Sequence, residues 1–158
     1  QEKIIPYNNC VFCKEIEIEM NGTDLDGNIG ANIEDMYESS KPCNFGGTCM
    51  GKGGEKVKAV VLDKLEHENI GFIHCDAQGA ENFIFYGGKE FIKKHRPVIF
   101  YENNCKYSES KYLYDNICKY YSDYEEESKF SLEEYCMKEL GYTKIIDRFS
   151  GVDDLLVP

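Results

Sequence analysis

The sequence predicts an α/β fold with parallel strands near its centre. Two nearly uninterrupted apolar runs, residues 70–75 and 97–101, are typical of strands that are buried on both faces. Between them, residues 81–95 place apolar side chains on one side and lysines on another, as an amphipathic helix does. Strand, helix and strand in this order predict a right-handed unit with parallel strands.

Length and charge set the class of protein. The chain has 158 residues, enough for one domain, 1–158, with one core. It carries 29 Asp and Glu against 18 Lys and Arg, a net charge of −11, so the basic surface that nucleic acids require is missing. No apolar stretch approaches the roughly 18 residues of a membrane-spanning helix, so we expect a soluble protein without a membrane partner.

The N-terminal third predicts two strands and an irregular insertion. Ile4 and Ile5 open a short apolar stretch, and residues 15–20 alternate Glu with Ile and Met, as a strand with one face in water does. Residues 21–54 are rich in Gly, Asn, Asp and Ser and predict a long, irregular insertion. A β-rich segment, residues 57–62, follows it.

The C-terminal elements have clearer signals at their ends. Residues 105–129 lack clean periodicity and predict a partly helical excursion over the surface. Ser131 and Glu134 form a capping box at the start of a helix over 132–140, and Gly141 suits its C-terminal end. Two final strands, 142–146 and 152–157, predict a hairpin that closes the sheet. In the helix over 81–95, Gly87 and Gly88 predict close packing against the sheet.

The eight cysteines are scattered and favour reduced thiols, hence an intracellular, cytoplasmic location. Cys10 and Cys13 form one CxxC pair, but Cys43 and Cys49 have the wrong spacing for a zinc knuckle or ribbon. We therefore expect small buried thiols and no metal site.

Both apolar strands of the predicted unit end in a carboxylate. Asp76 follows the first strand, and Glu102 follows the second. Ligands of open α/β sheets bind beyond the carboxyl ends of the strands, so we expect the two side chains to enter one crevice. The plainer alternative is that Asp76 caps the following helix and Glu102 marks the place where a strand reaches water.

These residues belong to motifs that resemble the FkbM family of S-adenosylmethionine-dependent methyltransferases. The matching segments are 73–81 (IHCDAQGAE), 96–102 (RPVIFYE), 44–48 (NFGGT) and the tail 154–158 (DLLVP). The resemblance implies a Rossmann-like class I methyltransferase sheet. The family's opening strand with its glycine-rich loop has no counterpart here, so we expect a partial domain, incomplete at its N-terminal side, that binds the cofactor weakly.

The resemblance also implies roles for individual residues and an activity, methylation of a hydroxyl on a sugar or another small molecule. Gln78 stands where many members have Glu, and His74 replaces a usual Lys. The implied residues are Asp76 and Glu102 for catalysis, Asn9, Cys10, Asp76 and Gln78 for S-adenosylmethionine, and Glu81 and Glu102 for the substrate.

A second class of function stays open at this point. The acidic, Tyr-rich region 105–135 could contact a partner, with the methyltransferase-like fold serving only as a scaffold. A sheet that lacks two strands would also expose an edge and apolar surface, through which copies of the chain could associate.

Overall fold

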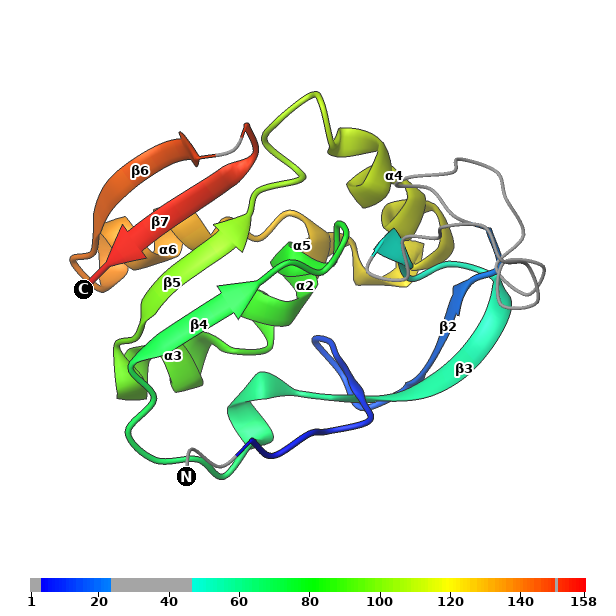
Figure 1. The fold of residues 1–158 in the computed structure, drawn as a ribbon, viewed down its shortest axis with the longest axis horizontal. Coiled ribbons are helices and arrows are strands. Elements are labelled where there is room, and N and C mark those ends of the chain that lie inside the picture. Colours follow the sequence, from blue (N-terminus) through cyan, green and yellow to red (C-terminus); the bar gives the residue numbers. More distant parts are fainter. Residues whose placement is uncertain (1–3, 24–46, 150) are drawn as a thin grey trace.

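The computed structural model describes residues 4–23, 47–149 and 151–158. Two small mixed sheets share one hydrophobic core in this part of the chain (Figure 1). The strands are β1 (Cys10–Val11), β2 (Glu17–Asn21), β3 (Gly53–Val60), β4 (Phe72–Cys75), β5 (Val98–Glu102), β6 (Thr143–Phe149) and β7 (Asp153–Val157). The fold is mixed α/β, as the sequence predicts.

The helices gather mainly behind the larger sheet, where Figure 1 shows α2, α3 and α6. The α-helices are α2 (Glu81–Tyr86), α3 (Lys89–His95), α4 (Lys111–Tyr120), α5 (Glu125–Ser128) and α6 (Leu132–Glu139), and the 3₁₀ turns are η2 (Leu62–Lys64) and η3 (Ser122–Tyr124). No helix in the described part of the chain is long and apolar enough to span a membrane.

The larger sheet has the strand order β4-β5-β7-β6. Strands β4 and β5 are parallel, with Cys75 opposite Tyr101, which confirms the predicted parallel pair. Strands β6 and β7 form the predicted antiparallel hairpin. The prediction that both parallel strands are central is wrong for β4, which lies at the edge of the sheet. Phe72 on this strand is 57% exposed, so the apolar run does not reflect burial on both faces.

The predicted helix over 81–95 is two helices, α2 and α3, because the chain breaks at Gly87 and Gly88. A Cβ atom on Gly87 would lie 2.9 Å from the Cα atom of Cys13, and one on Gly88 would lie 2.5 Å from Cδ2 of Leu62. The predicted close packing is confirmed, but the partners are the segments that follow β1 and β3 rather than the larger sheet.

The smaller sheet has the order β1-β3-β2, with β1 parallel and β2 antiparallel to β3. Strand β2 confirms the alternating pattern, since Ile18 is fully buried and Glu17 is exposed. The other N-terminal strand is β1, whereas Ile4 and Ile5 are exposed and lie outside any strand. Two strands therefore precede residue 21, but the first begins later than the apolar pair.

Most of the predicted insertion, including residues 44–46 of the family-like motif, lies outside the described residues. Its two described ends meet. Met20 forms an isolated antiparallel bridge with Met50, and the amide of Gly22 donates to the carbonyl of Lys52 at 3.0 Å.

The region from Cys105 onward is partly helical, as predicted, but much of it belongs to the core. Tyr107 and Tyr121 are buried, whereas Tyr112 and Tyr120 on α4 are exposed. Helix α6 begins as the capping box predicts, because the Ser131 side chain accepts a hydrogen bond from the Glu134 amide at 3.2 Å.

Candidate functional site

The carboxyl ends of β4 and β5 meet at one edge of the larger sheet, where the arrowheads of both strands point toward α4 (Figure 1). The last paired residues are Cys75 and Tyr101, so Asp76 and Glu102 follow at the same level on neighbouring strands. The sequence predicts this arrangement because adjacent parallel strands end on the same side of a sheet. Asp76 is exposed, and Glu102 is half-buried.

Glu102 lies in a strongly negative environment. Burial, as the largest cause, and the nearby carboxylates of Asp76, Glu81 and Asp153 together raise its pKa to about 7, against the lowering effect of a hydrogen bond from Asn104. Glu102 therefore changes its charge near neutral pH. We call Asp76, Glu81 and Glu102 the carboxylate cluster.

Glu81, the first residue of α2, supports the loop between β4 and α2 from within. It is 2% exposed, and its Oε1 atom accepts hydrogen bonds from the amides of Ala77 at 2.9 Å and Gly79 at 3.3 Å. Burial raises the pKa of Glu81, while these amides favour its charged form. In this arrangement the carboxylate stabilises the loop and is shielded from solvent. The family resemblance instead implies that Glu81 contacts the substrate.

The loop itself has an unusual backbone. Gln78 has a φ of 51°, a left-handed conformation that is uncommon outside glycine. Its Nε2 atom donates to Oδ1 of Asp76 at 2.7 Å, whereas its buried Oε1 atom has no hydrogen-bond partner. At Gly79 a Cβ atom would lie 2.6 Å from the backbone of Leu113 in α4. The loop is thus held between Glu81 and α4.

A cavity of about 350 Å³ opens beside this loop and reaches the smaller sheet. Its walls are mostly apolar, with Met20 and Met50 among them. The described residues that line it are Cys10, Val11, Met20, Thr48, Met50, Leu62, Ile73, His74, Cys75, Asp76, Ala77, Gln78, Ala80, Ile84 and Phe85.

The cavity contains three of the four residues that the resemblance assigns to the cofactor. Cys10, Asp76 and Gln78 line it, although Cys10 comes from the other sheet. Asn9 does not line the cavity, because its side chain is exposed and donates to the carbonyl of Lys58 at 3.3 Å. Glu102 lies beside the cavity, within electrostatic reach of Asp76, and is not one of its lining residues.

Asn104 was not identified from the sequence. It is 1% exposed, and its Nδ2 atom donates to Glu102 at 2.9 Å and to Glu81 at 3.2 Å, so it joins the two carboxylates. Its Oδ1 atom is buried without a hydrogen-bond partner. The sequence did contain one indication of its role. Asn104 follows closely after a strand that ends in a carboxylate, a position from which polar side chains often enter a site.

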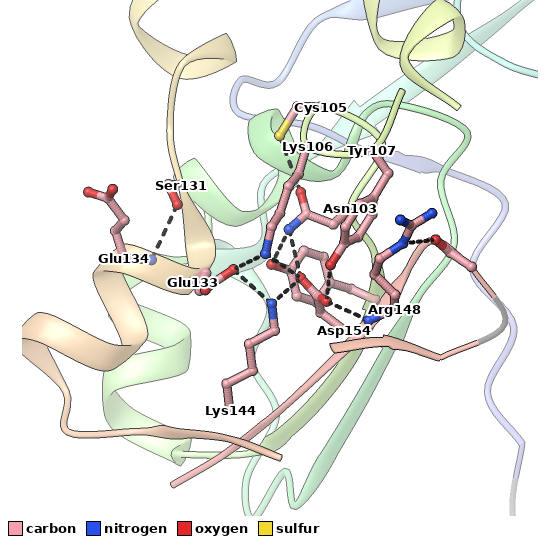
Figure 2. A network of polar contacts seen from close by, with 12 residues as sticks. Asn103, Cys105, Lys106, Tyr107, Ser131, Glu133, Glu134, Lys144, Arg148 and Asp154 are labelled. Atoms are coloured by element: carbon pink, nitrogen blue, oxygen red, sulfur yellow. Dashed lines mark hydrogen bonds and ion pairs between the residues drawn. The ribbon is translucent and has the colours of Figure 1, made fainter. Parts of the chain in front are cut away.

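Asn103, the preceding residue, belongs to a different group of polar side chains (Figure 2). Asp154, fully buried on β7, accepts hydrogen bonds from Asn103 at 2.8 Å and Tyr107 at 2.7 Å, and pairs with Lys144 at 2.9 Å. Lys144 also pairs with Glu133 at 3.0 Å. We call these five residues the Asp154 network, and its charges are paired within the protein.

The CxxC residues show no sign of a metal site. Cys10 and Cys13 are free thiols, and burial raises the pKa of both. No group of three or more His, Cys, Asp or Glu in the described residues could hold a metal ion. Cys43, which the zinc alternative needs, lies outside them.

A larger surface groove of about 660 Å³ runs between α2, α3, α5 and α6. Its charged side chains alternate in sign, as in Lys89, Glu90 and Lys93, and no residue of the carboxylate cluster lines it. The site that the strand ends predict is therefore the cavity with the adjoining carboxylate cluster. No protein-family model, curated protein or solved structure matches the chain.

Proposed function

We propose that the chain carries part of the active site of an S-adenosylmethionine-dependent O-methyltransferase related to the FkbM family. The observation that supports it best is that Cys10 meets Asp76 and Gln78 in one cavity beside Glu102, although Cys10 is distant from the other residues in the sequence. These are residues that the resemblance assigns to the cofactor and to catalysis.

The strand arrangement supports the proposal. The order β4-β5-β7-β6, with a parallel pair followed by an antiparallel hairpin, agrees with the closing half of the Rossmann-like methyltransferase sheet that the resemblance implies. In such sheets the ligand lies beyond the carboxyl ends of the parallel strands, the edge at which Asp76 and Glu102 are found.

The lining of the cavity suits the cofactor's charge. S-adenosylmethionine carries a positively charged sulfonium, and the described lining contains one carboxylate, Asp76, and no Lys or Arg. The walls are otherwise mostly apolar, and a volume of about 350 Å³ lies within the range of small-molecule sites. Asp76 and Gln78 would hold the polar part of the cofactor, and Cys10, Met20 and Met50 would contact its apolar surface.

The bound cofactor supplies an electrophilic methyl group that an oxygen nucleophile can take up. The protein must align the acceptor hydroxyl, remove its proton and exclude water. Asp76 would position the hydroxyl, and the hydrogen bond from Gln78 Nε2 would orient Asp76. Glu102, with a pKa of about 7, suits the role of a base that accepts the proton at neutral pH.

The proposal is tested by methyl transfer from radiolabelled S-adenosylmethionine to a panel of small hydroxyl compounds, with the full-length protein. Asp76→Asn keeps the size of the side chain and removes its charge, and we expect turnover to fall at least about 100-fold. Glu66→Gln is the matched control, because Glu66 is exposed and outside the cavity. Unchanged turnover in Asp76→Asn would remove this residue from the proposed role.

Calorimetry with S-adenosylmethionine tests the cavity separately. We expect Ile84→Trp, which fills the apolar wall, to weaken binding, and Glu66→Gln to leave it unchanged. Equal affinity in both variants would place the cofactor elsewhere.

A further inference from the structure

The carboxylate cluster lacks a positive partner. No Lys or Arg of the described chain forms an ion pair with Asp76, Glu81 or Glu102, although ion pairs are common elsewhere on this protein. Three acidic groups are thus close enough to influence one another without a cation to balance them. Such an arrangement favours any ligand that brings positive charge.

Two side-chain amides next to the cluster each leave an oxygen unused. Gln78 and Asn104 are 6% and 1% exposed, and both direct their nitrogen toward carboxylates of the cluster. Their oxygens, Oε1 and Oδ1, are buried without hydrogen-bond partners. A buried polar atom without a partner is unfavourable by roughly 1–3 kcal/mol, so it is rare unless a ligand or water completes it.

The acceptors at this site therefore outnumber the donors. Carboxylates and amide oxygens accept hydrogen bonds, and an ammonium group offers three N–H donors together with a positive charge. A neutral hydroxyl would supply one donor and leave the negative charge unbalanced. A carboxylate or phosphate would add charge of the same sign.

We propose that the carboxylate cluster binds the primary ammonium group of a small hydroxyl-bearing molecule. This inference rests on the proposed function, in which that molecule is the methyl acceptor, and it narrows the acceptor to amino alcohols and amino sugars. Asp76, which is exposed, and Glu102, which is half-buried, contact the ammonium group, and the unpartnered Oε1 of Gln78, in the same cavity wall as Asp76, accepts its third hydrogen bond. Buried Glu81 and Asn104 hold the loop and Glu102 from behind.

Binding is coupled to protonation. Glu102 faces Asp76 from the loop after β4, Glu81 from α2 and Asp153 from β7, and its pKa lies at about 7. An ammonium ion lowers that pKa, because it stabilises the charged carboxylate. Affinity for the ligand therefore rises between pH 6 and pH 8, a range in which an aliphatic amine stays protonated.

The test is an NMR titration of the ¹⁵N-labelled full chain with three probes that share a hydroxyl: ethanolamine, ethylene glycol and glycolate. The probes carry a positive, a neutral and a negative second group on the same two-carbon frame. The side-chain NH₂ signals of Gln78 and Asn104 report directly on the site. We expect ethanolamine to shift both signals and to bind about 10- to 100-fold more tightly than ethylene glycol.

Variants assign the effect to the cluster. Asp76→Asn and Glu102→Gln should each weaken ethanolamine binding at least about fivefold at pH 8, while Glu66→Gln leaves it unchanged. Asp76 is exposed, so its replacement keeps the fold intact even if Glu102→Gln disturbs the loop. Ethylene glycol or glycolate binding as tightly as ethanolamine would overturn the inference, as would the absence of any shift with ethanolamine up to about 50 mM.

The titration separates this inference from the proposed function. Ethanolamine binding without methyl transfer to any acceptor would refute the methyltransferase and leave the ammonium site standing. Methyl transfer to neutral hydroxyl compounds, with no preference for ethanolamine in the titration, would support the methyltransferase and refute the ammonium site.

Discussion

Two neighbouring residues, Asn103 and Asn104, belong to two acidic sites of opposite character. Asn103 donates to Asp154, whose network pairs its carboxylates with Lys144 and with the Tyr107 hydroxyl (Figure 2). Asn104 donates to Glu81 and Glu102, which have no cation among the described residues and share that one amide nitrogen. In the first site the protein itself supplies a cation for the carboxylates. In the second site, no described residue does so.

The difference shows what each site is suited for. A buried carboxylate that is paired and fully hydrogen-bonded holds structure together, and its removal leaves the partner charge exposed to an apolar interior. Carboxylates that repel one another beside unpaired amide oxygens contribute little to stability, and groups of this kind are common in functional sites. Substitutions in the Asp154 network should therefore change mainly the free energy of unfolding. Substitutions in the carboxylate cluster should change mainly ligand binding and its pH dependence.

The largest expected effect is on the stability of the fold, through the Asp154 network. Asp154→Asn removes the negative charge opposite Lys144, whose side chain is only 12% exposed, and we expect the free energy of unfolding to fall by about 3–5 kcal/mol. Urea denaturation at pH 7 measures it. Asp123→Asn, at an exposed position in η3, is the matched control and should stay within about 0.5 kcal/mol of the wild type. Equal stability of both variants would mean that the network does not stabilise the fold.

The two asparagines allow the sharpest comparison. Asn103→Ala removes a hydrogen bond to a fully buried carboxylate and should destabilise the chain by about 1–3 kcal/mol. Asn104→Ala should destabilise it less, because the substitution also removes an unpaired buried oxygen. NMR titration should show the pKa of Glu102 rising above about 7 in Asn104→Ala, since the lost hydrogen bond lowers it. A larger stability loss at Asn104 than at Asn103 would reverse our ranking.

Glu102 should give the protein a distinctive pH dependence. Its pKa rises from 4.5 to about 7 on folding, so the folded chain binds more protons than the unfolded chain between these values. Its contribution to stability is present below pH 4.5 and is lost as the pH rises through 7. Glu102→Gln should therefore be more stable than the wild type at pH 8, by up to about 1 kcal/mol, with a smaller difference at pH 5. Parallel stability curves from urea denaturation would argue against this role of Glu102.

The smallest expected effect concerns the loop. Gln78→Gly relieves the left-handed backbone at φ 51° and should change the free energy of unfolding by less than about 1 kcal/mol, in the stabilising direction. The same variant should lose ethanolamine binding and methyl transfer, because the amide that orients Asp76 is gone. A variant that is both stable and fully active would make Gln78 dispensable.

Much of this arrangement follows from local signals in the sequence. The apolar runs and their terminal carboxylates predicted the parallel pair and the meeting of Asp76 with Glu102, because strand ends determine where side chains emerge. The Ser131 capping box and the closing hairpin were also predictable, since both depend on residues close together in the chain.

The missed features depend on contacts between distant segments. The helix breaks at Gly87 because the backbone at Cys13 passes close by, and no periodicity contains that information. The edge position of β4 depends on which strands pair, which an apolar run cannot specify. Asn104 joins two carboxylates from different elements, so its importance appears only when those elements are brought together.

Gly79 has a consequence for motion in the molecule. Its φ is 97°, and even one methyl group there would collide with the backbone at Leu113 and Tyr114. With so little clearance, α4 cannot move toward the sheet unless the backbone at Gly79, three residues after Asp76, moves as well. A molecule that binds the exposed tyrosines of α4 would therefore contact a helix whose backbone touches the loop that carries Asp76.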